Sequence, residues 1–462
     1  MNFLDRLAIP ESGERLELLR YLLVIVTLIF IVYTGIVVVA STASAIFDWR
    51  GRKTGNKTYS RFAKDLADLA VTSRGVLLAI GVLPLITTIL IYAQLLYGMK
   101  LDVSTYLTVA ALFYFVGYYF LYSYKKSFHL DSIYSTFQNL ASSSNAEVRS
   151  DVATDVSSFE RSAVASRIKN GRRSAVLIWV GTWIFLGTTR LAFTPSRWAH
   201  PTLASVLFSG ETIWSLIDFA IVALVITSAA ILLFFFKFEH GIALDADDSY
   251  RKFVRSRVLP VGIMAAALEP IVLFFEIQNL PLTGVSNETF AVAGVAMFVA
   301  LMLVIMFYMM LKDSSINLGS YAFVGVILMV LAWAAKDEVA FHYATRVQDQ
   351  RLDERYDAML ASLSPNVAPP ARSGEEIYNT VCSACHRFNM KLVGPPYFMT
   401  LPHFVGKMDS LENFISNPYQ AVPGYPPMPK QPLKPQEVKN VAEYIMGQYL
   451  AAKKAGKAQY TQ

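Results

Sequence analysis

Cysteine is nearly absent from this chain, with two among 462 residues, and both lie in one short segment as Cys382 and Cys385. A structural zinc site needs four ligands, and only His403 lies near this pair. A thioredoxin-like dithiol needs a βαβ setting, which the helical, proline-punctuated tail of the sequence lacks. The two cysteines therefore serve another chemistry, and none remains for a structural disulfide.

Charged residues are also scarce, at 16% against 54% hydrophobic residues. The apolar residues arrive in runs of about 20, the length that crosses a bilayer as a helix. Eight such runs lie near 20–46, 74–97, 103–124, 174–193, 213–236, 258–277, 289–311 and 318–336. The sequence therefore predicts an all-α, polytopic bundle of about eight transmembrane helices.

Histidine is rare as well, with six in the chain. A row of b-type haems through a bundle needs histidines that face one another within the spans. The four histidines of the membrane part all lie near predicted span ends, namely His129, His200, His240 and His342. This argues against b-type haem inside the bundle. His200 and His342 share one predicted edge of the membrane, so one haem bound by both of them remains an open alternative.

Lysine and arginine gather in alternate connecting segments, a pattern typical of cytoplasmic loops. They occupy 50–64, 125–173 and 237–257, while the other side has little beyond Lys100 and Arg197. Eight spans return the chain to its starting side, so we expect both ends in the periplasm, outside a bacterial inner (cytoplasmic) membrane. Ala43-Ser44-Ala45 resembles a signal-peptidase site, but cleavage there would place the basic segment 50–64 outside, so the first run is read as a retained helix.

The tail contains Cys382-Ser383-Ala384-Cys385-His386, the Cys-x-x-Cys-His spacing of c-type haem attachment. Thioether bonds to two haem vinyl groups need two thiols one helical turn apart, and the imidazole that follows can bind the iron. The motif predicts one covalent haem c, held by Cys382 and Cys385 with His386 as an iron ligand. It therefore predicts electron transfer.

Residues from about Ser373 to Leu450 resemble a mono-haem class I cytochrome c. Gly374-Glu375-Glu376-Ile377-Tyr378 opens a short helix that ends in the haem motif, and Val393-Gly394-Pro395-Pro396 is similar to the family's Gly-Pro loop. The resemblance implies that the Pro395 carbonyl accepts the proton of the other His386 nitrogen, which fixes the imidazole ring. Gly424-Tyr425-Pro426-Pro427-Met428-Pro429 resembles the distal loop, with Met428 as the sixth ligand and the alternatives Met390, Met399, Met408 and His403.

The domain boundaries follow from these segments. We expect a periplasmic N-terminal segment over 1–19, an eight-helix unit over 20–345 with a cytoplasmic, amphipathic or partly flexible insertion at 125–173, a linker over 346–372 and a cytochrome c domain over 373–462. In that domain, Pro435 starts a closing helix that should pack against the helix beginning near Glu375.

The spans beginning at Ser73-Arg74 and Ser256-Arg257 share a context that suggests a 4+4 parallel repeat.

Carboxylates in the spans are costly in lipid and are candidates for function. Glu211 and Asp218 lie seven residues apart on the fifth span, as do Glu269 and Glu276 on the sixth, with Arg190 near the same level. They are candidates for quinol binding or proton transfer, while the structural alternative is that Glu211 favours a helix N-terminus and Glu269 pairs with Arg190. Glu269-Pro270 stands out because proline leaves a backbone carbonyl unbonded beside the acid.

Two functions follow as hypotheses. In the first, the chain is an electron carrier rather than an enzyme by itself, a subunit of a respiratory or photosynthetic complex with soluble or membrane-bound periplasmic redox partners. In the second, it is a quinol-oxidising or cytochrome bd-like oxidase subunit, with the haem domain as its electron port and a quinone as a further cofactor. The net charge of +6 reflects the basic loops, and no nucleic-acid signature is present, so the lipid bilayer and other subunits are the expected partners.

Overall fold

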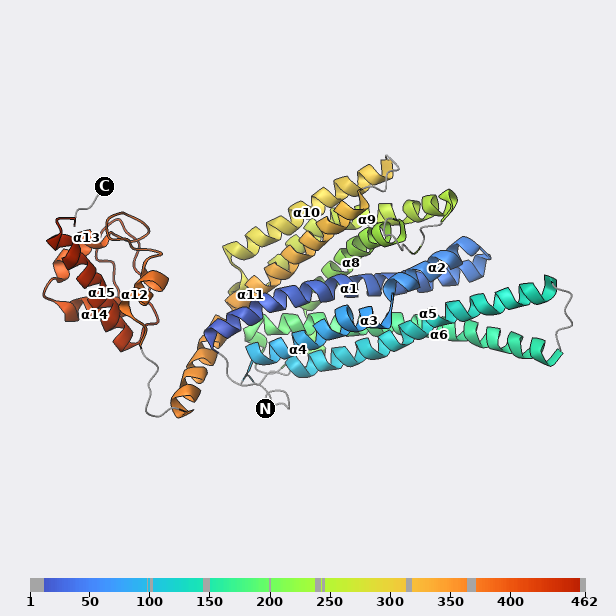
Figure 1. The fold of residues 1–462 in the computed structure, drawn as a ribbon, viewed down its shortest axis with the longest axis horizontal. Coiled ribbons are helices and arrows are strands. Elements are labelled where there is room, and N and C mark those ends of the chain that lie inside the picture. Colours follow the sequence, from blue (N-terminus) through green and yellow to red (C-terminus); the bar gives the residue numbers. More distant parts are fainter. Residues whose placement is uncertain are drawn as a thin grey trace. The chain divides into compact units, whose positions relative to one another are not determined.

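The computed structural model describes residues 12–97, 99, 103–143, 150–198, 201–236, 242, 246–312, 318–363 and 371–457. Over these ranges all regular structure is helical. The chain divides into two compact units, Met1–Asp357 and Ala358–Gln462, each with its own hydrophobic core. Figure 1 shows the helices of both units.

Within the described ranges, the first unit has eight helices that are long and apolar enough to cross a membrane, the number expected from the hydrophobic runs. They are α1 (Gly13–Thr54), the continuous stretch of α3 (Arg74–Val76), η2 (Leu77–Val82) and α4 (Leu83–Leu95), then α5 (Val103–Ser143), α6 (Ser150–Ala192), α8 (Gly210–Phe236), α9 (Asp248–Gln278), α10 (Asn287–Lys312) and α11 (Gly319–Leu363). Four short elements connect them: α2 (Lys57–Ala70), η3 (Pro195–Arg197), α7 (Leu203–Leu207) and η4 (Leu282–Gly284).

Helix α1 lies at the centre of the bundle and packs against α2, α4, α6 and α8 (Figure 1). Phe30, Val37 and Ala40 on α1 are fully buried. Gly35 permits the close approach of α8, because a Cβ atom there would come within 3.0 Å of Ile226 Cδ1. Small residues at such crossings are typical of helices that associate in membranes, where backbone proximity replaces the hydrophobic driving force.

Large apolar side chains cover the outside of the bundle. On α10, Val295, Phe298 and Ile305 are each about half exposed or more. An extended apolar surface of this kind is unusual on a water-soluble protein and suits a helix that faces hydrocarbon. The first unit is accordingly a multi-pass membrane bundle.

The predicted insertion at 125–173 is ordered helix wherever the structure describes it. Its residues continue α5 to Ser143 and begin α6 at Ser150, so the two helices form a long hairpin (Figure 1). Arg167 of α6 anchors this hairpin, because it lies 3.2 Å from Asp48 of α1 and 2.6 Å from Asp131 of α5. The described residues of this segment are therefore helical, and the interpretation of 125–173 as a cytoplasmic, amphipathic or partly flexible insertion stays a prediction.

The sequence predicts a linker over 346–372. In the structure the first part of this segment is helical and belongs to α11, which ends at Leu363. Residues 346–363 contain no proline, and the prolines that end a helix begin at Pro365. Arg20 of α1 holds α11 through ion pairs of 2.8 Å with Glu338 and with Asp349. The predicted segment 1–19 is likewise helical from Gly13, and its first eleven residues lie outside the described ranges.

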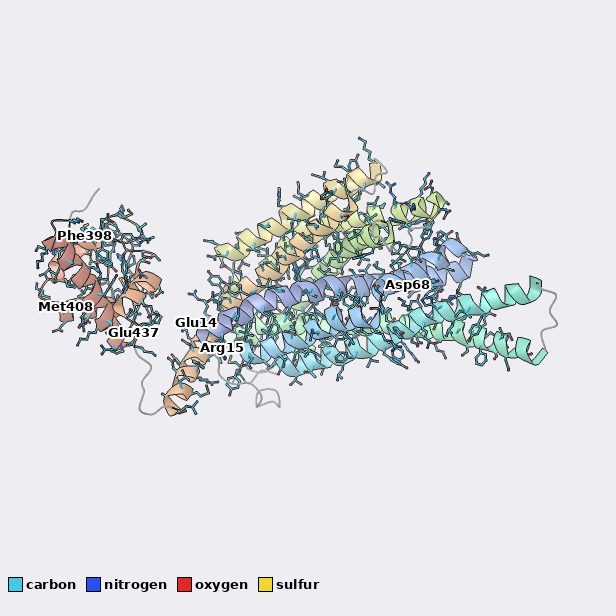
Figure 2. All side chains as sticks on the ribbon, viewed as in Figure 1. Glu14, Arg15, Asp68, Phe398, Met408 and Glu437 are labelled. Carbon is cyan, nitrogen blue, oxygen red and sulfur yellow. The ribbon has the colours of Figure 1, made fainter. Side chains whose placement is uncertain are left out.

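The second unit contains α12 (Gly374–Ile377), η5 (Tyr378–Cys382), α13 (Tyr397–Thr400), η6 (Leu401–Phe404), α14 (Met408–Ser416) and α15 (Pro435–Lys454). As predicted, α15 packs against α12, and Val441, Ile445 and Tyr449 form its buried stripe. Gly374 is required at this crossing, because a Cβ there would lie 2.1 Å from the Asn440 carbonyl oxygen. Phe398, Met408 and Glu437 of this unit are labelled in Figure 2.

Candidate functional site

The Cys-x-x-Cys-His motif lies at the end of η5 and in the turn that follows. The Ser383 amide donates to the Tyr378 carbonyl at 2.7 Å, and the His386 amide donates to the Cys382 carbonyl at 2.9 Å. These bonds wind the five residues into one tight turn. The turn places Cys382, Cys385 and His386 together on the wall of one cavity.

His386 is held from two sides by the Gly-Pro loop. Its Nδ1 atom lies 3.0 Å from the Pro395 carbonyl oxygen, the contact expected from that loop. A Cβ on Gly394 would come within 2.3 Å of His386 Cε1, so only glycine fits there. The Tyr397 ring stacks on the imidazole, with ring centroids 5.1 Å apart and planes 12° apart. The imidazole therefore has one orientation, with Nε2 left for a ligand bond.

Two neighbouring cavities share Cys382, His386, Pro395 and Met428 among their lining residues. Met428 reaches both cavities from the irregular proline-rich loop after α14. The alternative ligands Met390, Met399 and His403 are exposed, and neither they nor Met408 line the two cavities.

The walls of the two cavities suit a flat, largely apolar group, and they offer a nitrogen of His386 and the sulfur of Met428 as ligands. Apolar side chains line the larger cavity, including Leu401, Phe404, Leu411, Phe414, Ile415, Val441 and Ile445. Burial raises the pKa of the Cys382 thiol, because the apolar surroundings disfavour a thiolate. Among the described residues, no group of three or more His, Cys, Asp or Glu side chains could hold a bare metal ion. The residues present therefore fit a haem rather than a metal ion alone.

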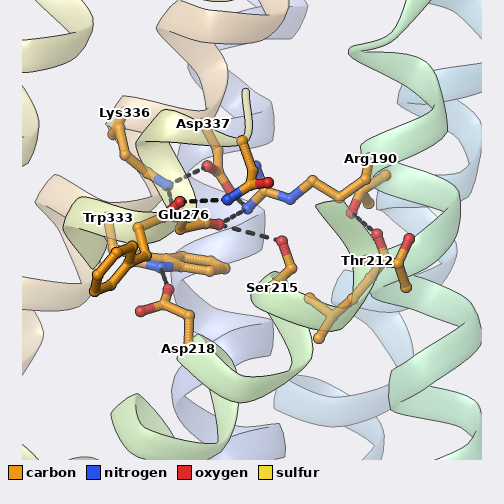
Figure 3. A network of polar contacts seen from close by, with 12 residues as sticks. Arg190, Thr212, Ser215, Asp218, Glu276, Trp333, Lys336 and Asp337 are labelled. Carbon is orange, nitrogen blue, oxygen red and sulfur yellow. Dashed lines mark hydrogen bonds and ion pairs between the residues drawn. The ribbon is translucent and has the colours of Figure 1, made fainter. Parts of the chain in front are cut away.

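A second polar site lies inside the first unit (Figure 3). Glu276 of α9 accepts hydrogen bonds from Arg190 of α6 and from Lys336 of α11. Asp337 lies 3.0 Å from Arg190 and 2.8 Å from Lys336. These four side chains form a ring of two cations and two anions, here called the charged ring. Removing one member of such a buried pairing costs about 3–5 kcal/mol.

Two further predicted carboxyls lie beside the charged ring. Asp218 of α8 accepts a hydrogen bond of 2.5 Å from the Trp333 indole (Figure 3). Glu269 of α9 is fully buried, and neither of its carboxyl oxygens has a hydrogen-bond partner among the described residues. The alternative that Glu269 pairs with Arg190 is wrong, because Arg190 bonds to Glu276 and Asp337 instead.

Glu211 does not join this group. It lies 2.9 Å from Arg197, and both side chains are partly exposed. Sequence reasoning also missed Lys336 and Asp337, because charges at the end of a hydrophobic run resemble an ordinary span end. The available signal was the run of three consecutive charged residues, Lys336-Asp337-Glu338, which begins three residues after Trp333.

The structure describes two histidines of the first unit, His129 and His342, and both are about half exposed. His200 and His240 lie outside the described residues. The argument against additional b-type haem therefore remains a prediction.

Comparison with known proteins identifies the family of the second unit. Residues 369–445 match the family described as cytochrome C oxidase, cbb3-type, subunit III. Cytochrome c-551 of Ectopseudomonas mendocina is 36% identical over 78 residues, which are 16% of this chain and 95% of that protein. Cytochromes c-551 of Azotobacter vinelandii (33% over 78 residues, 16% and 95%) and Stutzerimonas stutzeri (34% over 80 residues, 16% and 77%) are similar. No solved structure matches the chain.

The family match begins at residue 369, after the last of the eight long helices. It covers the haem motif, the Gly-Pro loop, the Met428 loop and most of α15. A cytochrome c domain implies a covalent haem c, in agreement with the cavity and its walls. Through this carboxy-terminal unit, the chain belongs to the cytochrome c family.

Proposed function

We propose that this protein is a membrane-anchored c-type cytochrome that transfers electrons on the periplasmic side of a bacterial inner membrane. The observation that carries the proposal is the apolar cavity lined by Cys382, His386 and Met428 on a chain with eight membrane-spanning helices. An electron carrier needs a redox group that is fixed, shielded from water and close to the surface. The second unit offers these conditions in a domain of about 100 residues.

Each residue of the site has a role in this proposal. Cys382 and Cys385 would hold the haem through thioether bonds, and His386 and Met428 would bind its iron. When bound, the haem supplies a reversible one-electron centre. The Pro395 carbonyl accepts the His386 Nδ1 proton and so leaves Nε2 as the nitrogen available to a metal. A thioether ligand raises the reduction potential, which suits a carrier at the high-potential end of a chain.

We also propose that both chain ends lie in the periplasm. The basic connecting segments lie at one end of the bundle, where α1 meets α2 and where α5 and α6 are joined (Figure 1). That end suits the cytoplasm by the positive-inside rule. An even number of spans then returns the second unit to the outer side.

The bundle is the proposed contact with other subunits of a respiratory or photosynthetic complex, because a single span would be enough to anchor the haem domain and the chain has eight candidate spans. We further propose that its helices form a 4+4 parallel repeat. In both halves the second span contains proline, at Pro84 in the first half and at Pro260 and Pro270 in the second. Both spans also carry a Ser-Arg pair, which lies at the start of α3 in the first half and inside α9 in the second. The proposed redox partners, soluble or membrane-bound, bind the second unit.

One observation favours the second candidate function, quinol oxidation by the chain itself. A small cavity of about 30 Å³ lies beside the charged ring, and Asp337 and Glu338 belong to its wall. These carboxyl groups can accept the protons that quinol oxidation releases. The electron-carrier proposal does not require this cavity.

One experiment tests both candidates. The full chain is purified, run on a denaturing gel stained for haem peroxidase activity, and reduced in nanodiscs by either a soluble one-electron donor or a quinol analogue. We expect a stained band that Cys382→Ala weakens, and reduction by the soluble donor alone. A blank gel for the wild-type chain contradicts the cytochrome proposal. Fast reduction by the quinol analogue, lost in Asp337→Asn, favours the second candidate.

A further inference from the structure

The charged ring leaves two neighbouring carboxyls without a cation of their own. Arg190 and Lys336 balance Glu276 and Asp337 one for one. Asp218 receives a neutral indole N–H at one oxygen, while its other oxygen, Oδ1, has no partner among the described residues. Glu269 has no partner at either oxygen in the same set. Both side chains are fully buried.

An ionised carboxylate is costly when it is buried without a cation or hydrogen-bond donors. Two such groups near each other are costlier, because their charges repel, and Asp218 interacts electrostatically with both Glu269 and Glu276. The least costly state is therefore the one in which Asp218 and Glu269 keep their protons. In that state the six side chains together carry no net charge.

Lys336 distinguishes this pair from an inert pair of buried acids. Its ammonium group acts on both Asp218 and Glu269 while it bonds to Glu276. One carboxylate can form under this field, but a second would face the first without a further cation. A small cavity of about 30 Å³, room for about two water molecules, touches Asp337 and also Trp333, the hydrogen-bond partner of Asp218.

We propose that Asp218 and Glu269 form a proton-binding pair in the membrane bundle, which holds two protons at rest and exchanges one with solvent. On release, the carboxylic O–H bond breaks, the proton passes to water, and the carboxylate stays under the field of Lys336. No electron is transferred in this step. The inference is independent of the haem and of the proposed function.

The groups that face the pair come from several helices. They are Arg190 of α6, Glu276 of α9 and Lys336 of α11, while Asp337 of α11 contacts the pair's neighbours Arg190 and Lys336. The charges of α10, which packs on α9, are Glu288 and Lys312 at its two ends. Arg20 of α1, which packs on α8, bonds to Glu338 and Asp349. The field on the pair is therefore set mainly by the charged ring.

Infrared spectroscopy of the full chain in nanodiscs tests the proposal, because a protonated carboxyl has a carbonyl band separate from that of a carboxylate. At neutral pH we expect two buried-acid components in the wild type. Asp218→Asn and Glu269→Gln should each remove one, and Glu211→Gln, which changes a partly exposed acid outside the pair, should remove neither. On raising the pH, one wild-type component should disappear and the other persist.

Two other outcomes would overturn the proposal. Spectra of Asp218→Asn and Glu269→Gln that match the wild type would show that both acids are ionised and would overturn the proposal. Loss of the bands on adding sodium chloride, but not choline chloride, at constant pH would overturn it in favour of a sodium site. If one variant does not assemble, the other variant and the wild-type titration decide by the same criteria.

A matched pair of variants gives a second readout. Glu269→Gln replaces a neutral acid by a neutral amide of the same shape, so we expect little change in the thermal unfolding of the bundle. Glu276→Gln, seven residues further along α9, removes a charge from the charged ring and should lower the unfolding temperature clearly. A greater loss for Glu269→Gln than for Glu276→Gln would contradict a protonated Glu269.

Discussion

At the scale of single residues, Met428 is the proposed sixth ligand of the haem iron, and its replacement tests that assignment. It lines both cavities beside His386. Met428→Ala removes the thioether, and we expect the midpoint potential to fall by a sizeable part of the ~0.8 V range that axial ligands span. A redox titration with the low-spin spectrum recorded at each step measures this fall.

Met390→Ala is the matched control, because Met390 is 51% exposed and does not line either cavity. Its potential and spectrum should equal those of the wild type. An unchanged spectrum in Met428→Ala would assign the sixth ligand elsewhere, and His403→Ala would then be measured next.

At the scale of the element, Glu437 fixes the start of α15. Its carboxylate accepts a 2.6 Å bond from Arg372 Nε and a 3.0 Å bond from the Lys434 amide, so it joins the segment before α12 to the first turn of α15. The hydrogen bond from Arg372 lowers the pKa of Glu437. Glu437→Gln should reduce the unfolding free energy of the haem domain by about 1 kcal/mol, a low value because solvent screens the 41% exposed Arg372.

The pH dependence of this loss follows from the direction of the shift. A carboxylate whose pKa is lower in the folded state stabilises the fold fully above its unfolded pKa of about 4.3. The difference between wild type and Glu437→Gln should therefore be constant at neutral pH and vanish as the pH falls through the folded pKa. Denaturant unfolding at several pH values measures it, with Glu443→Gln, an exposed acid on the same helix, as the control. A difference that grows in acid would contradict the mechanism.

At the scale of the whole molecule, the proposed orientation makes opposite ends of the bundle accessible from opposite sides. Leu282, between α9 and α10, is 93% exposed and belongs to the proposed outer side. Ser158, on the hairpin of α5 and α6, is exposed and belongs to the proposed inner side. A membrane-impermeant maleimide applied to intact spheroplasts should label Leu282→Cys and leave Ser158→Cys unlabelled until the cells are opened.

The parent chain provides the background for this labelling, because its two cysteines are expected to be blocked by thioether bonds. The reverse pattern, with Ser158→Cys labelled in intact spheroplasts, would place the haem domain in the cytoplasm and contradict the proposed topology. Labelling of both positions at once would indicate leaky cells, which a cytoplasmic marker enzyme reveals in the same sample.

The count of eight long helices was predictable because hydrocarbon thickness sets the length of a spanning segment, and local composition records that length. The position of the haem motif was predictable because Cys-x-x-Cys-His is contiguous and Gly394-Pro395 follows within nine residues. The helical state of 346–363 was missed because polar composition resembles a tether. The fixed hairpin of α5 and α6 was missed because Arg167 reaches Asp48, a partner more than a hundred residues away.

The sequence by itself determined the two kinds of unit, the number of spans and the residue types of the haem site, because these depend on composition and on contiguous motifs. Only the tertiary structure decided which charges meet inside the bundle. Arg190, Glu276, Lys336 and Asp337 come from three helices far apart in the chain, and Glu269 is left outside their ring by the packing of those helices. Pairing of this kind depends on helix rotation and depth, which side chains distant in sequence fix together.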